Sequence, residues 1–290
     1  MDYINDNELT IVIKTFQRKK ALVCLLESIK KYYFHVPIII VDDSKKTYKK
    51  EIISLFSDLK ITYIVTDFDI GLSKGRNIGI NAVRSKYFLL CDDDFEFDER
   101  TNIGRAIKIL EEEKFDIVGG RLFEKYRINS LFSFLTILKH PKRIFDFFSN
   151  VEISRVFNGF LEINSSSVVA RIETNGNLYE EGIEKYSFDI ISNFFIARTN
   201  KIKEMQGWLP ENIKVGEHVL FFIRCKKYGL KIGFTPLLGI RHHPEKSIFY
   251  SSFRLRAIKM KKISFLHLGI SSFKQFDMHG NLMYIWESGE

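Results

Sequence analysis

The sequence predicts an α/β fold, with a mostly parallel, doubly wound sheet and flanking helices, and three observations support this prediction. Short apolar segments alternate with amphipathic segments through residues 9–122, as is typical of right-handed βαβ units. The segment Ile38–Val41 is entirely apolar, which suits a parallel strand covered on both faces. Polar side chains follow several of the apolar segments, at the sheet edge where ligands of such folds bind.

The first half of the chain contains five expected strands and four expected helices. Strands are expected at residues 9–15, 38–41, 61–65, 87–91 and 116–122, and helices at about 19–33, 52–56, 71–83 and 101–113. Apolar residues recur at helical spacing in the first helix. Gly71, Gly75 and Gly79 lie four residues apart, so they fall along one side of a helix. We expect that side to approach the sheet, or a diphosphate, closely.

The pattern is less regular in the second half. In residues 126–156, aromatic side chains flank the basic cluster at 139–143, which predicts an inserted helical pair packing on the core, with a lid or an interfacial membrane contact as alternatives. β-like runs follow at 157–169 and 190–198, a short helix at 200–205, a helix at 217–228 and a strand pair within 232–240. The basic tail from about residue 246 is expected to begin as a helix.

Composition and charge restrict the class of protein. Of the 290 residues, 45% are hydrophobic and 28% charged, and the net charge is +8, as in a globular protein that favours anionic partners. The basic residues are spread along the chain, so we expect no nucleic-acid partner. Cys24, Cys91 and Cys225 are isolated in apolar segments, which predicts core packing under reducing conditions. The polar N-terminus and the lack of long apolar runs predict a cytoplasmic protein.

Three consecutive aspartates, Asp92, Asp93 and Asp94, follow directly after an apolar strand-like segment. Like charges at one strand end repel each other, and a bound divalent cation would relieve that repulsion. A solvated acidic turn is the alternative. Thr15 and Asp43 also lie at predicted strand ends, and the carboxyl ends of parallel strands meet at one edge. This convergence favours a ligand site there.

Six segments, in order, resemble inverting glycosyltransferases of the GT-A fold. They are residues 10–15 (TIVIKT), 40–44 (IVDDS), 71–77 (GLSKGRN), 90–94 (LCDDD), 215–218 (VGEH) and 240–242 (IRH). The likeness is greatest to family-2-like enzymes and to ganglioside-type β-1,4-N-acetylgalactosaminyltransferases, through Lys86-Tyr87 and residues 116–120 and 193–198. It covers roughly residues 9–245. Arg241-His242 also resembles the third metal-ligand position of β-1,4-galactosyltransferases.

The resemblance implies a metal-dependent, inverting transfer of a hexose or N-acetylhexosamine, with GalNAc favoured, from a UDP-sugar to a glycan or glycolipid hydroxyl. It implies a nucleotide-sugar-binding half at residues 1–125, an acceptor-binding α+β half at 126–245, and a basic helical tail at 246–290. Aromatic–basic interleaving at 131–148 and in the tail also suggests peripheral contact with the inner face of an anionic membrane. The sequence does not predict an oligomeric state.

Residue roles are implied in the same way. Thr15 and Asp43 would border the nucleobase, Arg76 the ribose or diphosphate, and Asp92 the ribose or metal-bound waters, with Asp93 also in the donor site. Asp92, Asp94 and His242 would form the metal site, and oxygen ligands with one imidazole favour Mn²⁺ over Mg²⁺. Glu217 would be the catalytic base, with His218 as the alternative because the ganglioside-type enzymes keep a histidine at its position.

Ordinary roles and two rival functions remain open. Glu217 could be a carboxylate favoured at a helix N-terminus, and His242 a loop histidine. A sugar nucleotidyltransferase would share the sheet and the metal, but residues 15–18 contain no glycine for a phosphate loop. A non-catalytic basic module that binds glycan or nucleic acid would need no acidic triplet.

Overall fold

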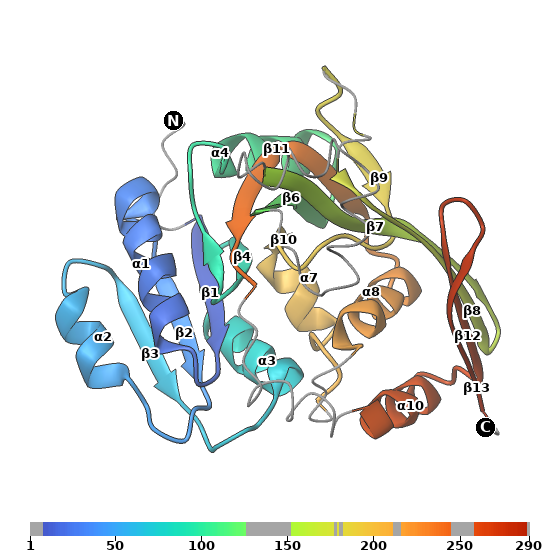
Figure 1. Cartoon of the computed structure of the whole chain (residues 1–290), viewed down its shortest axis with the longest axis horizontal. Helices are drawn as coiled ribbons and strands as arrows, with labels where there is room; N and C mark the ends of the chain where they lie inside the picture. The colour runs from blue at the N-terminus through green and yellow to red at the C-terminus, as the bar shows by residue number, and fades with distance from the viewer. Residues whose placement is uncertain are drawn as a thin grey trace, which may run out of the picture.

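The computed structural model describes residues 8–125, 152–176, 179, 182–210, 216–244 and 258–288. One mixed sheet runs through these residues, with helices on both of its faces (Figure 1). Its strands lie in the order β13-β12-β8-β7-β6-β10-β4-β1-β2-β3, and β11 pairs with β6, β5 and β9 beside this path. The predicted α/β fold is therefore confirmed, but the sheet is mixed rather than mostly parallel, because many of its described strand pairs are antiparallel.

The first half follows the predicted alternation closely. Its elements are β1 (Leu9–Thr15), α1 (Lys19–Tyr33), β2 (Ile38–Asp42), α2 (Lys49–Leu55), β3 (Ile61–Val65), α3 (Leu72–Ala82), β4 (Tyr87–Asp92), β5 (Phe95–Glu96), α4 (Ile103–Glu112) and β6 (Ile117–Lys125). Strands β3, β2, β1 and β4 are parallel neighbours. The short strand β10 (Phe195–Arg198) lies antiparallel between β4 and β6, so a strand from the second half completes the sheet of the first.

The second half differs from expectation at three places. Its other elements are β7 (Glu152–Asn164), β8 (Ser167–Asn175), β9 (Tyr186–Phe188), α7 (Thr199–Glu204), α8 (Glu217–Lys227), β11 (Ile232–His242), α10 (Ile258–His267), β12 (Ser272–Asp277) and β13 (Leu282–Glu287). The strand pair expected within 232–240 is the single strand β11, whose register shifts between Phe234 and Gly239. Only the last four residues of the run at 190–198 form a strand.

The tail corrects the third expectation. After α10 it forms an antiparallel hairpin of β12 and β13, and β12 pairs with β8, so the tail is only partly helical. The hairpin extends the sheet at its far edge (Figure 1). The inserted helical pair was predicted for residues 126–156, and the membrane contact for 131–148. Residues 126–151 lie outside the described residues, whereas residues 152–156 begin strand β7, so the prediction of a helix is wrong for that last part. The division of the chain at residues 125 and 245 stays a prediction.

Two hydrophobic clusters cover the two faces of the central strands. In β1, Ile11 and Ile13 pack on the side of α1 and α4, whereas Val12 packs on the side of α3 and α8. Alternate residues of a strand point to opposite faces, and β2 and β4 divide in the same way. Burial on both faces explains why these strands read as continuous apolar runs.

The glycines of α3 bring that helix close to the sheet, as predicted. A Cβ atom at Gly79 would lie 2.7 Å from Cγ1 of Val12, and one at Gly75 would overlap the side chain of Lys14. Gly71 precedes the helix at φ +89°, a conformation that favours glycine. The close contact holds α3 against β1 and β2, from where Arg76 reaches Asp92 at the end of β4.

Two further expectations were tested. Cys91 and Cys225 are buried, but Cys24 is exposed on α1, so core packing is confirmed for two of the cysteines and wrong for the third. Among the described residues, no helix combines the length and apolar content needed to cross a bilayer.

Candidate functional site

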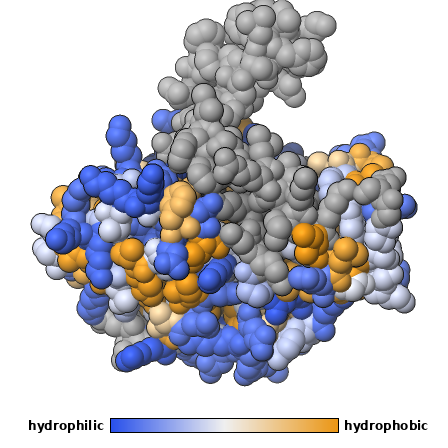
Figure 2. All heavy atoms as spheres, turned by 90° about the horizontal axis from the view of Figure 1, so that it is seen from below, coloured by the Kyte–Doolittle hydropathy of each residue, from blue (hydrophilic) through white to orange (hydrophobic). Residues whose placement is uncertain are grey.

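The carboxyl ends of β1, β2 and β4 meet at one edge of the sheet, as predicted. Thr15 lies beside Asp42 in the β1–β2 pair, and Lys14 lies beside Asp92 in the β1–β4 pair. β2 and β3 point downward in Figure 1, and Figure 2 views the molecule from below. The coloured part of that face mixes hydrophilic surface with smaller hydrophobic patches.

Each aspartate of the triplet contacts a basic side chain. Nη2 of Arg76 lies 2.8 Å from Oδ1 of Asp92. The guanidinium of Arg18 bridges Asp93 and Asp94, and its Nη1 lies 2.7 Å from Oδ2 of Asp94. Asp93 and Asp94 are almost fully buried, so this pairing offsets the unfavourable burial of their charges.

Burial and neighbouring charges set the pKa values of Asp93 and Asp94. Burial raises the pKa of Asp93 to about 7, aided by the charge of Asp94 and opposed by Arg18 and by a hydrogen bond from Thr15. Burial would also raise the pKa of Asp94, but His242 and Arg18 hold it below its ordinary value. The pKa values of these two neighbouring carboxyls therefore move in opposite directions.

His242 is held between two carboxylates. It lies in β11 opposite Phe95 of β5, which places its Nε2 3.5 Å from Oδ2 of Asp94. Its Nδ1 lies 2.7 Å from Oε1 of Glu124. Burial would lower the pKa of His242, but Asp94 and Glu124 outweigh that effect and raise it to about 9. Metal-binding histidines commonly have a carboxylate on one ring nitrogen and the metal on the other. A pKa of about 9 leaves the ring of His242 protonated at neutral pH, so a cation bound at Nε2 would have to displace that proton.

The residues present fit a cation held jointly by protein and substrate. Asp94 and His242 offer one carboxylate and one imidazole at short range, whereas the Asp92 carboxylate contacts Arg76. Within the described ranges, no three acidic, histidine or cysteine side chains surround a common point. Mg²⁺ sites commonly use one or two protein ligands and complete the shell with phosphate oxygens, so two protein ligands are enough here.

Glu217 reaches this edge from the second half of the chain. It begins α8 directly after Gly216 (φ +83°), and its Oε1 lies 3.5 Å from Nη1 of Arg76. The guanidinium of Arg76 also lies over the ring of Trp208, 5.6 Å from its centroid. The helix N-terminus and Arg76 both stabilise the ionised carboxylate. Arg76 thereby brings together Asp92 and Glu217, which the sequence separates widely.

His218 points into the core. Its ring lies between Phe157 and Phe222, at centroid distances of 5.3 and 5.1 Å, and its Nδ1 bonds to Oδ1 of Asn193. Burial, together with the charge of Arg76, lowers the pKa of His218 to about 3. At neutral pH this imidazole is therefore a weak proton acceptor.

Comparison with known proteins agrees with this geometry. The sequence profile of the family named glycosyl transferase family 2 matches residues 10–159. The chain belongs to glycosyl transferase family 2. It is 40% identical over 114 residues to β-1,4 N-acetylgalactosaminyltransferase 2 of Mus musculus, covering 39% of this chain and 21% of that protein. It is 29% identical over 215 residues to β-1,4 N-acetylgalactosaminyltransferase 1 of Rattus norvegicus, covering 74% and 35%.

A solved structure shows the same fold. S. aureus TarS 1-349 in complex with UDP-GlcNAc superposes with a TM-score of 0.58 at 14% identity, over 89% of this chain and 66% of that one. This agreement confirms the GT-A architecture of the family 2 chain. The chain spans about a third or less of the length of the two relatives with similar sequence.

Two basic residues of this family 2 site escaped the sequence analysis. Lys14 is buried and paired with Asp43, whose other oxygen accepts from the backbone N–H of Gly71 at 3.1 Å. Burial lowers the pKa of Lys14, and Asp43 opposes that effect. A lysine within an otherwise apolar strand was the available signal. The second residue is Arg18, which lies in a turn and gives no periodic signal.

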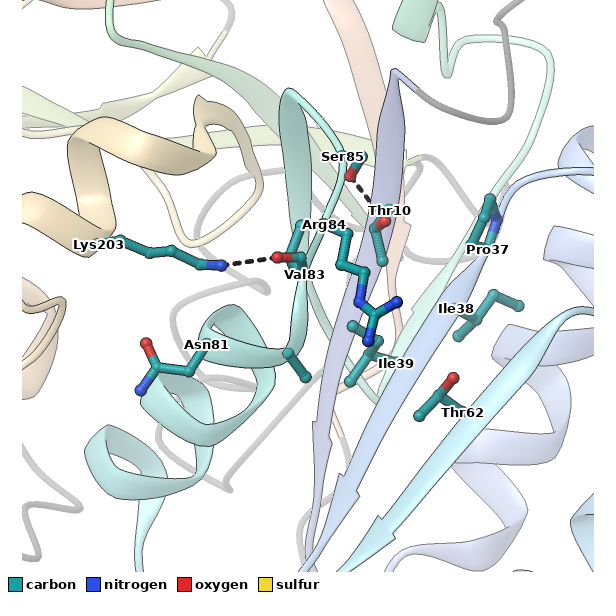
Figure 3. Close-up of a pocket in the computed structure, with 11 residues that line it drawn as sticks. Thr10, Pro37, Ile38, Ile39, Thr62, Asn81, Val83, Arg84, Ser85 and Lys203 are labelled. Carbon is teal, nitrogen blue, oxygen red and sulfur yellow. Dashed lines mark hydrogen bonds between the residues drawn. The ribbon is translucent and has the colours of Figure 1, made fainter.

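A large cavity in the described part of the chain lies elsewhere. It has a volume of about 840 Å³ and opens at the amino ends of β1 and β2 (Figure 3). Lys203 reaches toward it from α7, and its Nζ donates to the carbonyl of Val83, whereas Arg84 lies over the starts of β1 and β2 (Figure 3). No acidic side chain lines it, so it offers no carboxylate ligand for a metal ion.

We expect the pH dependence of stability to depend on His218. Its folded-state pKa of about 3 lies below the ordinary value of 6.5, so the unfolded chain takes up the proton first as the pH falls. As the pH falls from 7 to 5, His218 should therefore lower the free energy of unfolding by about 2 kcal/mol. In urea unfolding, the change in the free energy of unfolding between these two pH values should be about 2 kcal/mol smaller in His218→Gln than in the wild type.

The exposed His279, in the turn between β12 and β13, provides a matched control. His279→Gln should keep the wild-type pH dependence. An unchanged slope in His218→Gln would show that His218 is not buried in its neutral form.

Proposed function

We propose that the chain is a metal-dependent, inverting glycosyltransferase. It transfers a hexose or N-acetylhexosamine, with GalNAc favoured, from a UDP-sugar to a hydroxyl of a glycan or glycolipid. One observation carries the proposal: Arg76 contacts both Asp92 of the acidic triplet and Glu217 of the second half. A single displacement needs this juxtaposition, with groups for the leaving diphosphate beside a base for the incoming hydroxyl.

The reaction is a single displacement at the anomeric carbon. The acceptor hydroxyl gives its proton to a carboxylate oxygen of Glu217 while its oxygen bonds to the anomeric carbon. The bond between that carbon and the diphosphate oxygen breaks, and UDP leaves with the electron pair. Attack opposite to the leaving group inverts the configuration.

Asp94 and His242 would hold the cation, and the donor diphosphate would complete its coordination. When bound, a Mn²⁺ or Mg²⁺ ion neutralises charge that develops on the leaving diphosphate. The mixed oxygen and imidazole ligands favour Mn²⁺. We assign Asp92 to the ribose or to metal-bound waters, because its carboxylate already contacts Arg76.

The other residues that we assign to the donor lie at the carboxyl ends of β1, β2 and β4. The backbone of Asp43 bonds to that of Thr15, which supports a shared role for these two residues beside the nucleobase. Both oxygens of Asp93 already accept bonds, from Thr15 and from Arg18. Asp93 therefore acts on the donor indirectly, by holding the hydroxyl of Thr15 in place.

Glu217 is the better candidate for the base. Its carboxylate lies at the edge occupied by the triplet, whereas His218 is enclosed by aromatic rings and has a low pKa. Its place at the helix N-terminus also favours a negative charge there. We assign His218 to packing beneath Glu217.

The choice of sugar rests on the relatives. Two of them are named β-1,4 N-acetylgalactosaminyltransferases, and the structural neighbour binds UDP-GlcNAc, so we favour a UDP-N-acetylhexosamine. A nucleotidyltransferase is disfavoured because the turn after β1 turns Arg18 toward the aspartates rather than forming a glycine-rich phosphate loop. A non-catalytic binding module would need no base, so it does not explain why Glu217 and Asp92 contact the same arginine.

A donor panel tests the proposal. UDP release should be measured for UDP-GalNAc, UDP-GlcNAc, UDP-Gal and UDP-Glc, with and without glycan and glycolipid acceptors, and products identified by mass spectrometry. Acceptor-stimulated release of UDP supports transfer. Release of pyrophosphate, or binding without turnover, would favour the nucleotidyltransferase or the binding module.

Transfer should require a divalent cation. Excess EDTA should abolish activity, Mn²⁺ should restore it best, and Asp94→Ala should remain inactive because it loses a ligand. Initial rates against metal concentration measure this. Asp67→Ala, at an exposed aspartate after β3, is the charge-matched control and should behave as wild type. Full activity in EDTA, or in Asp94→Ala, contradicts the metal site.

Turnover should also depend on the Glu217 carboxylate. Glu217→Gln keeps size and hydrogen bonding but cannot accept the proton, so kcat should fall about a hundredfold or more while UDP-sugar affinity is kept. His218→Ala should have a smaller effect. Glu204→Gln, at an exposed position in α7, controls for the substitution.

Kinetics and NMR of the product distinguish the outcomes. Near-normal turnover in Glu217→Gln would transfer the role of base to His218 or another group. A product with retained anomeric configuration would rule out the single displacement.

A further inference from the structure

Arg18 occupies an unusual position, directly before α1 and over the acidic triplet. Its Nη1 lies 2.7 Å from Oδ2 of Asp94, and its Nη2 bonds to Oδ1 of Asp93. The side chain is only 13% exposed. Neither the periodicity of the sequence nor the proposed reaction requires a second arginine at this place, since Arg76 already contacts the triplet.

The contact with Arg18 occupies Oδ2 of Asp94, an atom that a bound divalent cation would need as a ligand. Oδ2 of Asp94 faces both Nη1 of Arg18, at 2.7 Å, and Nε2 of His242, at 3.5 Å. An ion bound between Asp94 and His242 would therefore share this oxygen with the guanidinium. Two cations at one carboxylate oxygen repel each other strongly where burial limits screening. The guanidinium and a divalent cation compete for Asp94.

The backbone at Arg18 is fixed, whereas its side chain is long enough to move. Gln17 adopts φ +60°, and its N–H donates to Oγ of Ser44 at 2.7 Å. These contacts hold the turn between β1 and α1 in place. The guanidinium lies at the end of several rotatable bonds and matches both carboxylate and phosphate in geometry.

We propose that Arg18 is a built-in counter-cation that blocks the divalent ion until the donor binds. The inference rests on the proposed function, because it assumes that a UDP-sugar diphosphate enters beside the triplet. When the diphosphate arrives, Arg18 transfers its two hydrogen bonds from Asp93 and Asp94 to phosphate oxygens. Asp94 then becomes available to the cation, so nucleotide and cation enter the site together.

This exchange has a thermodynamic consequence. If UDP removes Arg18 from Asp94, then UDP raises the affinity for Mn²⁺, and Mn²⁺ raises the affinity for UDP by the same factor. Part of that factor comes from direct contact between the ion and the diphosphate and does not depend on Arg18. The other part should disappear when Arg18 is replaced. An arginine that only stabilises the folded chain would leave the factor unchanged.

The test measures Mn²⁺ binding without turnover. The dissociation constant of Mn²⁺, from the electron paramagnetic resonance signal of the free ion, is determined with and without saturating UDP. Proteins compared are the wild type, Arg18→Gln, Arg18→Lys and Arg84→Gln. Arg84 is exposed and lies at the opposite end of the strands (Figure 3), so it controls for the loss of one positive charge.

Arg18→Gln should bind Mn²⁺ alone about tenfold or more tightly than the wild type, because the competing charge is gone. The factor by which UDP tightens Mn²⁺ binding should fall to a similar extent. Arg18→Lys keeps the positive charge but lacks the two-pronged guanidinium, so its Mn²⁺ affinity and its UDP factor should lie between those of the wild type and Arg18→Gln. Arg84→Gln should match the wild type in both quantities.

The inference is overturned if the UDP factor is the same in the wild type and both Arg18 variants. Arg18→Lys carries the test if Arg18→Gln does not fold, as judged by circular dichroism. If the wild type binds neither UDP nor Mn²⁺ under any condition, the proposed function fails as well. If it binds both, and only the dependence on Arg18 is missing, the proposed function stands without this inference.

Discussion

The structure depends on three consecutive carboxylates at the end of β4, of which Asp93 and Asp94 are buried and Asp92 is partly buried. Charges of one sign cannot be removed from water at such short range without compensation. Here the compensating groups are Arg76 from α3, Arg18 from the turn before α1, and His242 from β11. Each element must therefore be placed correctly for the triplet to be stable. The fold and the candidate site are in this sense a single arrangement.

Arg76 connects the acidic triplet to Glu217 of the second half. Glycines at the α3–sheet contact allow the helix to lie close to β1, which brings Arg76 to Asp92, and α8 brings Glu217 to the same guanidinium. The antiparallel strand β10 fixes the second half against the first by pairing with both β4 and β6. The residues that we assign to the donor and the residue that we assign as the base thus meet at one edge of a continuous sheet.

Much of the first half could be predicted from sequence, because strands buried on both faces give continuous apolar runs and parallel strands end at one edge. The insertion of β10 between β4 and β6 could not, since pairing between distant segments leaves no local pattern. The pairing of β12 with β8 is long-range in the same way, whereas the hairpin of β12 and β13 is local, and the turn around Gly280 was a usable signal. Arg18 and Lys14 were missed because a side chain's partner depends on packing, although Lys14 in an apolar strand was a usable signal.

The central claim is that the edge containing Asp94, His242 and Glu217 binds the donor and its cation. The most direct measurement is an anomalous difference map from crystals grown with UDP and Mn²⁺. The account predicts one strong Mn²⁺ peak bonded to Asp94, His242 and the diphosphate, with Glu217 on the side where the sugar would lie. A Mn²⁺ or UDP site elsewhere, such as the cavity lined by Arg84, with this edge empty, would contradict it.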